Sequence, residues 1–260
     1  MPRYFLEVAY KGTRYSGFQV QENAITIQSE VEKAFNVIQG LKPGKLSDSG
    51  TLVDQVKFTG SSRTDAGVHA LQNYFHFDFD SEVHPQLVYK MNAILPQDIV
   101  IKRLVSVSDT AHSRFDAISR RYVYKIHSFK DPFLHDRSFY FPYTLDYQLL
   151  DQTAAYITEQ TNFWGFSKTN TQVKNFDCRV QESFWTLNGS ELTYTIESNR
   201  FLRGMVRLLT AVQLKVARNR ISYGQFQDFF NGVLKCPYSV PAHGLYLQKV
   251  TYPESLILGK

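Results

Sequence analysis

Apolar side chains alternate with polar ones along several short segments, which is the spacing of half-buried β-strands. The first segment is residues 3–10, where Tyr4, Leu6, Val8 and Tyr10 share one side. The same alternation, or a short apolar run, predicts further strands at 53–59, 74–79, 98–108, 119–128, 178–188, 190–198 and 244–252. The predicted strands 178–188 and 190–198 meet at Asn188-Gly189, a pair of residues typical of tight hairpins.

Other segments carry apolar side chains every three or four residues, the spacing of one helix face. Thr26 can cap a helix that runs through Ile38, and Ser222 can cap one that reaches Val233. Further helices are predicted at 85–95, 145–160 and 201–218. Residues 40–51 are predicted to form a flexible polar loop. Because helices and strands do not alternate regularly, the pattern favours an α+β fold with a largely antiparallel sheet.

The length of the chain, 260 residues, allows one large domain or two modest ones with a full hydrophobic core. We expect two halves, 1–108 and 109–260. No apolar run reaches the roughly 18 residues of a membrane span, and the N-terminal segment lacks the pattern of a signal peptide. Cys178 and Cys236 match no metal-binding spacing, so we expect free thiols in a cytoplasmic protein that has no contact with a membrane.

Charge and aromatic content suggest one class of function, nucleic-acid binding, without establishing it. Lys and Arg number 29 against 24 Asp and Glu, for a net charge of +5, and the chain contains 20 Phe and 16 Tyr. Basic side chains neutralise phosphates and aromatic rings stack on bases, which suits a nucleic-acid binder. Aromatic residues also fill ordinary protein cores, so composition alone leaves both interpretations open.

Residues 60–70, GSSRTDAGVHA, hold the densest group of reactive side chains, with Arg63, Thr64, Asp65 and His69 around two glycines. Glycine permits backbone shapes that other residues resist, so the loop could present Asp65 into a cleft. The alternative is an ordinary Asx turn in which the carboxylate binds nearby backbone N–H groups.

Two further segments combine arginine with apolar or aromatic residues. Arg203 and Arg207 lie four apart on one face of the predicted helix 201–218, and RRYVY at 120–124 interleaves basic and aromatic side chains on a strand. Either segment could contact nucleic acid, or could be an ordinary protein surface. The histidines match no metal-binding spacing, and neither a GxxxxGK[ST] nor a GxGxxG motif is present.

Taken in order, these segments resemble one family, the tRNA pseudouridine synthases of the TruA type. Residues 63–70 are similar to its active-site motif, Arg-Thr-Asp-x-Gly-Val-His-Ala. Its other motifs resemble residues 10–21, 26–35, 113–126, 201–209 and 241–252.

Several positions depart from the family pattern. Lys11 stands where Asp is usual and Phe18 where Trp is usual. Ser61 and Ser62 precede Arg63, and residues 211–222 lack the expected glycines. These segments would shape the cleft that receives the RNA.

The resemblance implies the pseudouridine-synthase fold, which is a mixed, mainly antiparallel sheet flanked by helices, in two related α+β halves around a central cleft. It implies a homodimer that acts on tRNA, in the anticodon stem-loop at positions 38 to 40. The product is an isomer of the substrate, so no cofactor and no metal are expected.

The resemblance also implies roles for individual residues. Asp65 matches the nucleophile, and Arg207 matches a residue whose guanidinium would keep that carboxylate ionised. Tyr122 matches the tyrosine that packs against the target base and helps remove its C5 proton. Whether Asp65 attacks C1′ or removes a 2′ proton stays open.

Around this centre, substrate-binding roles are expected for four residues. Arg63 would help hold the target base out of its stack, and Leu245 would form an apolar wall. Thr64 and His69 belong to the same motif. Candidate phosphate contacts are Arg120, Arg121 and Arg203, followed by Arg200, Lys215, Arg218 and Arg220.

Two other functions are compatible with parts of this pattern. One is a tRNA-binding or chaperone protein that shares the fold and modifies nothing, although Asp65, Tyr122 and Arg207 are all retained. The other is a hydrolase of small molecules, which would need a second carboxylate near Asp65. The motif 60–70 contains none.

Overall fold

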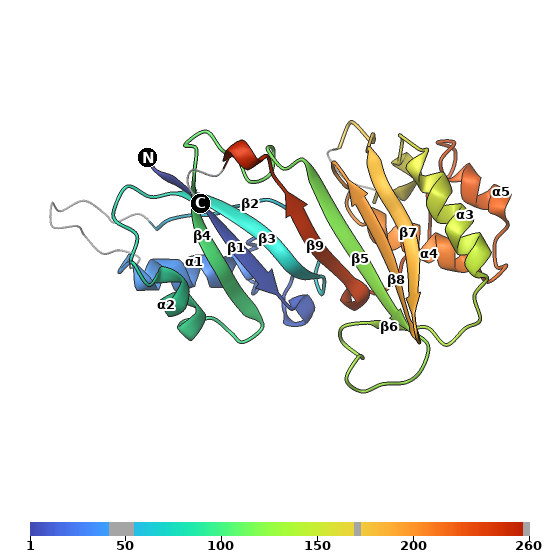
Figure 1. Ribbon diagram of the computed structural model, residues 1–260, viewed down its shortest axis with the longest axis horizontal. Coiled ribbons are helices and arrows are strands. Elements are labelled where there is room, and N and C mark those ends of the chain that lie inside the picture. Colours follow the sequence, from blue (N-terminus) through green and yellow to red (C-terminus); the bar gives the residue numbers. More distant parts are fainter. Residues whose placement is uncertain (42–54, 169–172, 257–260) are drawn as a thin grey trace. The chain divides into compact units, whose positions relative to one another are not determined.

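The chain forms two compact units in the computed structural model, which describes residues 1–41, 55–168 and 173–256 (Figure 1). Unit 1 contains residues 1–118 and the chain from 249 onward, and unit 2 contains residues 119–248. Each unit combines a largely antiparallel set of strands with packed helices, which confirms the α+β class. The functional halves 1–108 and 109–260 stay a prediction.

The sheet of unit 1 is built around its N-terminal strand. Its strands are β1 (Arg3–Tyr10), β2 (Thr59–Gly60), β3 (His69–Asp78) and β4 (Ile99–Val107). β1 lies between β3 and β4 and is antiparallel to both, and β2 pairs with β3. The predicted strand at 3–10 is confirmed, and its Leu6 lies opposite Phe75 with both side chains fully buried. Phe5 and Glu7 on the other face are buried as well, so the strand is not half-buried as the alternation predicts.

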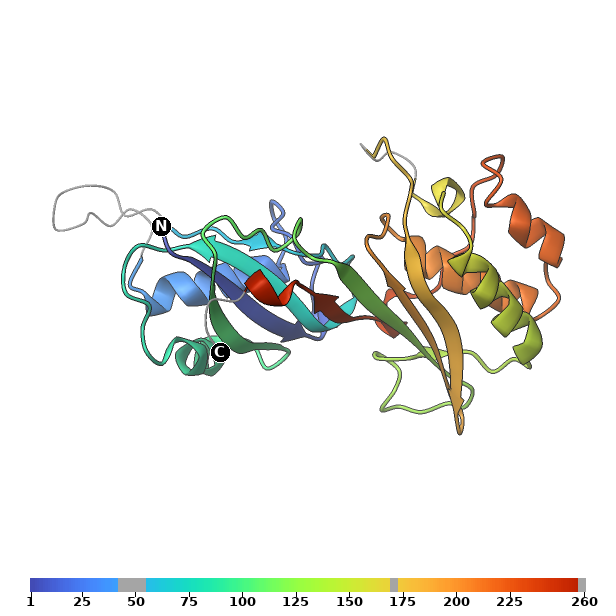
Figure 2. The ribbon, with the colours of Figure 1, turned by 45° about the horizontal axis from the view of Figure 1, so that its top comes forward.

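Two helices, α1 (Ile27–Ile38) and α2 (Leu87–Ile94), lie on one face of this sheet (Figures 1 and 2). Thr26 caps α1 as predicted, since its hydroxyl accepts a hydrogen bond from the backbone N–H of Ser29. Phe35 of α1 meets the ring of Phe77 edge-on, with centroids 4.7 Å apart. These contacts bury the apolar face of the helix against the strand that follows the RTDAG loop.

The strand predicted at 53–59 is wrong for its described part, because only Thr59 and Gly60 join the sheet. Side chains of α1 accept hydrogen bonds from backbone N–H groups that would otherwise pair with a neighbouring strand. Asn36 accepts a hydrogen bond from the N–H of Val56 at 2.9 Å, and Glu32 accepts one from Phe58 at 2.8 Å. The predicted loop 40–51 lies outside the described residues from position 42 onward.

The opposite face of the unit 1 sheet contains a buried carboxylate. Glu7 accepts hydrogen bonds from Arg103 at 2.6 Å and from the Tyr74 hydroxyl at 2.8 Å. Burial raises the pKa of Glu7, but these bonds and one from Gln72 outweigh it, so the pKa lies below its ordinary value. The carboxylate therefore stays ionised, and it ties β1 to both of its neighbours.

Unit 2 has its own antiparallel strands. They are β5 (Ser119–His127), β6 (Phe139–Tyr140), β7 (Val180–Asn188), β8 (Glu191–Ser198) and β9 (Leu245–Thr251), the last of which passes into unit 1 after Gln248. β8 lies between β5 and β7, and β6 runs parallel to β5. The hairpin is confirmed, but its turn residues are Gly189 and Ser190, since Asn188 pairs with Glu191. Gly189 takes the left-handed φ of +61°.

In the described part of unit 2, the α-helices are α3 (Tyr147–Thr158), α4 (Met205–Val216) and α5 (Tyr223–Asp228). α4 begins later than the predicted residue 201, because Gly204 precedes it with a left-handed φ of +76°. α5 ends before the predicted Val233, whose side chain is exposed. Trp185 of β7 donates a hydrogen bond to Gln213 of α4 at 2.9 Å and so joins sheet and helix.

Two further sequence expectations concern the cysteines and the membrane. Cys178 and Cys236 are free, as predicted. Both are also buried, and burial raises the pKa of each thiol to about 11. Within the described ranges, no helix combines the length and the apolar character that a bilayer span requires.

Replacing Arg103 with leucine removes the cation that faces Glu7. We expect the free energy of unfolding at pH 7 to fall by about 1–3 kcal/mol, the usual effect of losing a hydrogen bond to a buried charged group. Because the pKa of Glu7 is lowered on folding, its stabilisation is present above its ordinary pKa and is lost as the pH falls through the folded value. Urea denaturation should therefore show a difference between Arg103→Leu and wild type that shrinks as the pH falls below the ordinary pKa of a glutamate side chain and through the folded value.

Lys102→Leu is the matched control, because Lys102 is an exposed neighbour on β4 that donates to the carbonyl of Leu71 and not to a carboxylate. Its effect should be small and nearly independent of pH. A constant difference for Arg103→Leu across this pH range would contradict the role given to Glu7.

Candidate active site

The loop at 61–68 connects β2 to β3, and buried polar side chains hold it in place. The hydroxyls of Thr64 and Tyr10 are 2.8 Å apart and hydrogen bonded. Asn73 is fully buried and donates to the Tyr10 hydroxyl at 3.2 Å and to the carbonyl of Ser62 at 2.9 Å. This chain of bonds fixes the loop to the last residue of β1 and to β3.

The segment that follows β1 packs directly against the same loop. The N–H of Phe18 donates to the carbonyl of Thr64 at 3.1 Å. A Cβ atom on Gly12 would lie 2.0 Å from the carbonyl oxygen of Val68, closer than any side chain can come. Gly17 has a φ of +106°, and a Cβ atom there would lie 3.1 Å from the carbonyl oxygen of Thr64. The two motifs at 10–21 and 60–70 are therefore one packed unit.

Asp65 is half-buried at the turn of this loop. Its carbonyl accepts a hydrogen bond from the N–H of Val68 at 3.1 Å, and Gly67 supplies the left-handed φ of +78° that the turn requires. Arg63, two residues earlier, is exposed. The loop thus presents the carboxylate of Asp65 and the side chain of Arg63, while the residues Ser62, Thr64 and Val68 of the same loop are buried.

His69 lies at the base of the loop, at the start of β3, and is almost completely buried. Its Nδ1 accepts a hydrogen bond from the backbone N–H of Gly12 at 3.0 Å. This contact gives His69 a structural part in joining the two motifs. The substrate-binding role expected of it stays a prediction.

The departures from the family motif fit the local packing. Phe18 stacks on Phe75 with ring centroids 4.6 Å apart and planes 12° apart. Gly60 makes room for it, since a Cβ there would lie 2.1 Å from the ring of Phe18. The hydroxyls of Ser61 and Ser62 are buried and have no hydrogen-bond partner among the described residues. No contact in the structure explains why serine occupies these two positions.

Sequence reasoning missed the supporting residues of the loop. It placed Tyr10 in an apolar stripe and gave no part to Asn73. A signal was available, because Asn73 is a polar residue two positions before Phe75 and therefore on the same, helix-facing side of β3. A polar side chain at such a buried position needs hydrogen-bond partners.

The other predicted catalytic residues belong to unit 2. Tyr122 lies on β5 opposite Ile196 of β8 and is mostly buried. Its ring meets Phe201 edge-on at 5.1 Å, with planes 85° apart. Phe201 therefore sets the plane of the Tyr122 ring.

Arg207 is half-buried in the first turn of α4, and it is anchored to backbone. Its Nε donates to the carbonyl of Val240 at 2.8 Å, and Tyr124 donates to the next carbonyl, of Pro241, at 2.8 Å. Burial raises the pKa of Tyr124, and the charge of Arg207 opposes that shift. The two side chains thus hold the segment that leads to Leu245, which is buried at the start of β9.

Arg203 does not share a helix face with Arg207, so that prediction is wrong. Gly204 takes a left-handed φ and starts the helix after Arg203, which remains in the preceding turn and is exposed. The carbonyl of Arg203 accepts a hydrogen bond from the N–H of Lys168 at 3.3 Å.

The two arginines at the start of β5 differ in their partners. Arg120 donates to the carbonyl of Asn199 at 2.7 Å. Arg121 forms ion pairs with Glu197 at 2.5 Å and Glu182 at 2.8 Å, and its pKa is raised by the hydrogen bond to Glu197. A phosphate contact at Arg121, as predicted, would have to compete with two carboxylates.

Two of the remaining candidate cations lie over aromatic rings. The Lys215 ammonium is 4.4 Å from the ring centre of Tyr238, and the Arg218 guanidinium is 3.6 Å from that of Tyr143. A cation over a ring face is attracted by the ring's electron density and held in a defined direction.

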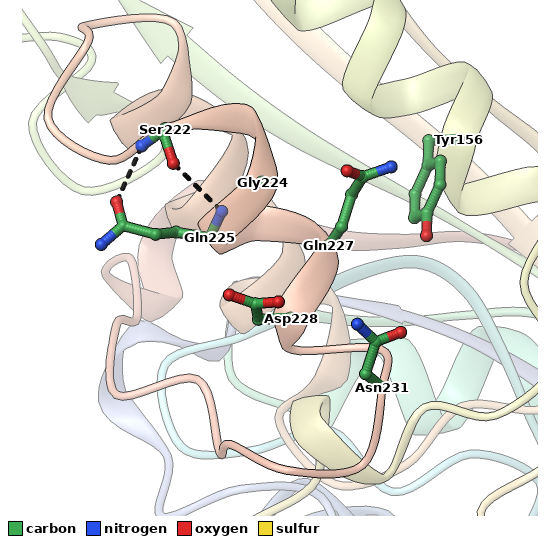
Figure 3. A pocket seen from close by; sticks show the side chains of 7 residues that line it. All are labelled: Tyr156, Ser222, Gly224, Gln225, Gln227, Asp228 and Asn231. Carbon is green, nitrogen blue, oxygen red and sulfur yellow. Dashed lines mark hydrogen bonds between the residues drawn. The ribbon is translucent and has the colours of Figure 1, made fainter.

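An open polar hollow of about 530 Å³ lies beside α5, with Tyr156 on its rim (Figure 3). Ser222 and Gln225 of its lining are already hydrogen bonded to each other's backbone N–H groups, as Figure 3 shows. None of the predicted catalytic residues contributes to it. In the part of the chain that the structure describes, no three His, Cys, Asp or Glu side chains are grouped as metal ligands.

Comparison with known proteins gives consistent results. A family model described as tRNA pseudouridine synthase matches residues 156–253. A protein of Parabacteroides distasonis named tRNA pseudouridine synthase A is 36% identical, over 98% of this chain and 98% of its own length. A protein of the same name from Porphyromonas gingivalis is 37% identical, over 99% of this chain and 100% of its own length. Another from Staphylococcus aureus is 32% identical, over 98% of this chain and 94% of its own length.

Gly12→Ala tests the packing of the two motifs. The added methyl group would meet the backbone of Val68 at 2.0 Å, so the loop has to move. We expect the free energy of unfolding, measured by urea denaturation, to fall by about 1–3 kcal/mol or more, as for other overpacked sites.

Gly224→Ala is the control, since the nearest atom to its new Cβ would be 3.9 Å away and Gly224 lies in a helix. Alanine there should be neutral or stabilise by up to about 1 kcal/mol. Equal stability of Gly12→Ala and wild type would show that the loop does not need the close approach.

Proposed function

This chain belongs to the tRNA pseudouridine synthase A family, and we propose that it converts uridine to pseudouridine in tRNA with Asp65 as the nucleophile. The activity itself is that of an isomerase. The observation that supports Asp65 most strongly is the hydrogen-bonded support of its loop, in which Thr64, Tyr10 and Asn73 fix the backbone beside the carboxylate.

The reaction breaks the bond between C1′ of the ribose and N1 of uracil and forms a bond from C1′ to C5. The hydrogen on C5 leaves as a proton, and N1 gains one. Substrate and product have the same atoms and the same oxidation level, so the balance requires neither an oxidant nor a group donor. We propose on this ground that the enzyme needs no cofactor.

We assign Tyr122 and Arg207 to the same reaction, by their correspondence with the family motifs. Tyr122 would pack on the target base and assist removal of the C5 proton, and its ring is held for this by Phe201. Arg207 would favour the ionised form of the nucleophile. The hydrogen bond from its Nε to the carbonyl of Val240 fixes the position of that end of the guanidinium.

Substrate binding follows the same correspondence. We propose that Arg63 occupies the space left by the displaced base, for which an exposed side chain next to the nucleophile is suited. Leu245 would form an apolar wall, and Thr64 and His69 would hold the loop to which the RNA binds. Phosphate contacts are proposed for Arg120, Arg121 and Arg203.

We further propose that the enzyme is a cytoplasmic homodimer that acts on the anticodon stem-loop, at positions 38 to 40 of tRNA. The net charge of +5 supports a polyanionic substrate. The competing function is a tRNA-binding or chaperone protein without activity. It is disfavoured by the presence of Asp65, Tyr122 and Arg207 together in a chain of this family.

The decisive measurement is tritium release from tRNA that carries 5-³H-uridine. Moving the glycosidic bond to C5 must expel the label, so the wild type should release it. Asp65→Asn keeps the shape of the side chain and removes its charge, and we expect the rate to fall by at least about a thousand-fold. Asp80→Asn, at an exposed aspartate of unit 1, should behave as wild type.

The outcomes separate the competing functions. If folded wild-type protein binds tRNA in a salt-dependent manner but releases no tritium, the isomerase proposal fails and the binding function gains support. Release of free uracil would indicate a hydrolase instead.

Mapping the product tests the proposed target. Chemical modification specific for pseudouridine, followed by primer extension, should locate the new bases at positions 38 to 40 of the treated tRNAs. Pseudouridine confined to other stems would refute the anticodon assignment and leave the isomerase assignment intact.

A further inference from the structure

Phe115 combines high exposure with a fixed position. Its side chain is 74% exposed, yet its ring lies 4.2 Å from that of His112, with planes 34° apart. His112 in turn lies 4.5 Å from His76 of β3. Phe133 is similarly exposed, at 79%, but has no ring contact in the described chain. The stack beneath Phe115 therefore distinguishes it from an ordinary surface phenylalanine.

The backbone around Phe115 is held by its own turn. His112 Nδ1 accepts hydrogen bonds from the N–H groups of Arg114 at 3.1 Å and Phe115 at 3.3 Å. The N–H of His112 donates to the carboxylate of Asp116 at 2.7 Å. These three bonds close the turn and so fix the backbone from which the ring of Phe115 projects.

The same turn is anchored to the sheet of unit 1 through Ser113, which is fully buried. Its N–H donates to Nδ1 of His76 at 3.2 Å, and its carbonyl accepts a bond from the Tyr252 hydroxyl at 2.5 Å. Its hydroxyl donates to the carbonyl of Thr59 at 3.0 Å. Thr59 belongs to β2, the strand from which the loop carrying Asp65 starts. One strand thus supports both Asp65 and Phe115.

The charge around the ring is also defined. The Arg114 guanidinium lies 5.8 Å from the ring centre of Phe115. Burial lowers the pKa of His112, and burial together with the charge of His112 lowers the pKa of His76 to about 4. Both histidines are therefore uncharged at pH 7, and the positive charge next to Phe115 is the guanidinium of Arg114, which lies over the ring.

We propose that Phe115 is a stacking platform for an unpaired base of the substrate tRNA, with Arg114 as the adjacent positive charge. An exposed ring that rests against His112 offers a π-face on which a base can stack, and a neighbouring cation favours the polyanion that carries the base. Phe115 is a positioning residue, because it holds a nucleotide other than the one that reacts. The inference rests on the proposed function, which supplies tRNA as the ligand.

The test compares substitutions that keep or remove the π-face. Phe115→Ala and Phe115→Leu should each raise the Kd and the KM for tRNA by roughly ten-fold, the effect of losing one stacked base, and change kcat by less than about three-fold. Phe115→Trp and Phe115→Tyr should retain near wild-type values. The added indole of Phe115→Trp should be quenched when tRNA binds, relative to wild type treated identically.

Phe133→Ala is the matched control, because it removes an equally exposed phenylalanine that lacks the stack, and it should bind tRNA as wild type does. Wild-type affinity of Phe115→Ala would overturn the platform, and so would Phe115→Leu behaving like Phe115→Trp. The tritium assay separates the two proposals. If the wild type releases tritium but Phe115→Ala binds tRNA as tightly as wild type, only the platform is refuted. If the wild type releases no tritium, the isomerase proposal is refuted, and the comparison of tRNA affinities still decides whether Phe115 is a platform.

Discussion

The position of Asp65 depends on Thr64, the residue before it, which is bound through both its side chain and its backbone. The Tyr10 hydroxyl bonds its Oγ1, and the N–H of Phe18 bonds its carbonyl. Tyr10 ends the central strand of unit 1, and Asn73 on the neighbouring strand holds the same hydroxyl. A loop would otherwise be the least constrained part of the unit. Here it takes its geometry from the middle of the sheet, which suits the role of nucleophile proposed for Asp65.

Unit 2 uses a different device for a similar purpose. Arg207 and Tyr124 come from a helix and a strand, and both bond the carbonyls of two consecutive residues, Val240 and Pro241. Because the two carbonyls belong to neighbouring residues, the helix and the strand both hold the short segment that leads to β9. The unusual sequence of α4 supports this arrangement. Gln213 stands in the segment that lacks the family's glycines, and it accepts a hydrogen bond from Trp185, so the departure is packed into the core of the unit.

Much of the fold was accessible from the sequence, because strands such as 3–10 and the helix after Thr26 are encoded by local periodicity and capping. The failures have non-local or conformational causes. Residues 55–58 do not form the predicted strand, because the backbone N–H groups of Val56 and Phe58 bond Asn36 and Glu32, about 20 to 26 positions away. The left-handed φ of Gly204 makes α4 begin later than predicted. For the site, the resemblance of the motif points to Asp65, whose role stays a prediction. The residues that position it could not be found by motif, since hydrogen-bond partners such as Asn73 are defined only once the strands are paired.

Unit 1 is interrupted in the chain by the whole of unit 2, and this has a consequence for synthesis on the ribosome. The β1, β3 and β4 strands emerge early, but Tyr252, which bonds the carbonyl of Ser113 and packs edge-on against Phe5, follows Ser113 by 139 residues. At about 5–20 residues per second, roughly 7–28 s separate the two. During that interval the nascent chain carries an incompletely covered apolar face beside Phe5 while unit 2 is still being made. The enzyme's N-terminal unit is thus begun first and completed last.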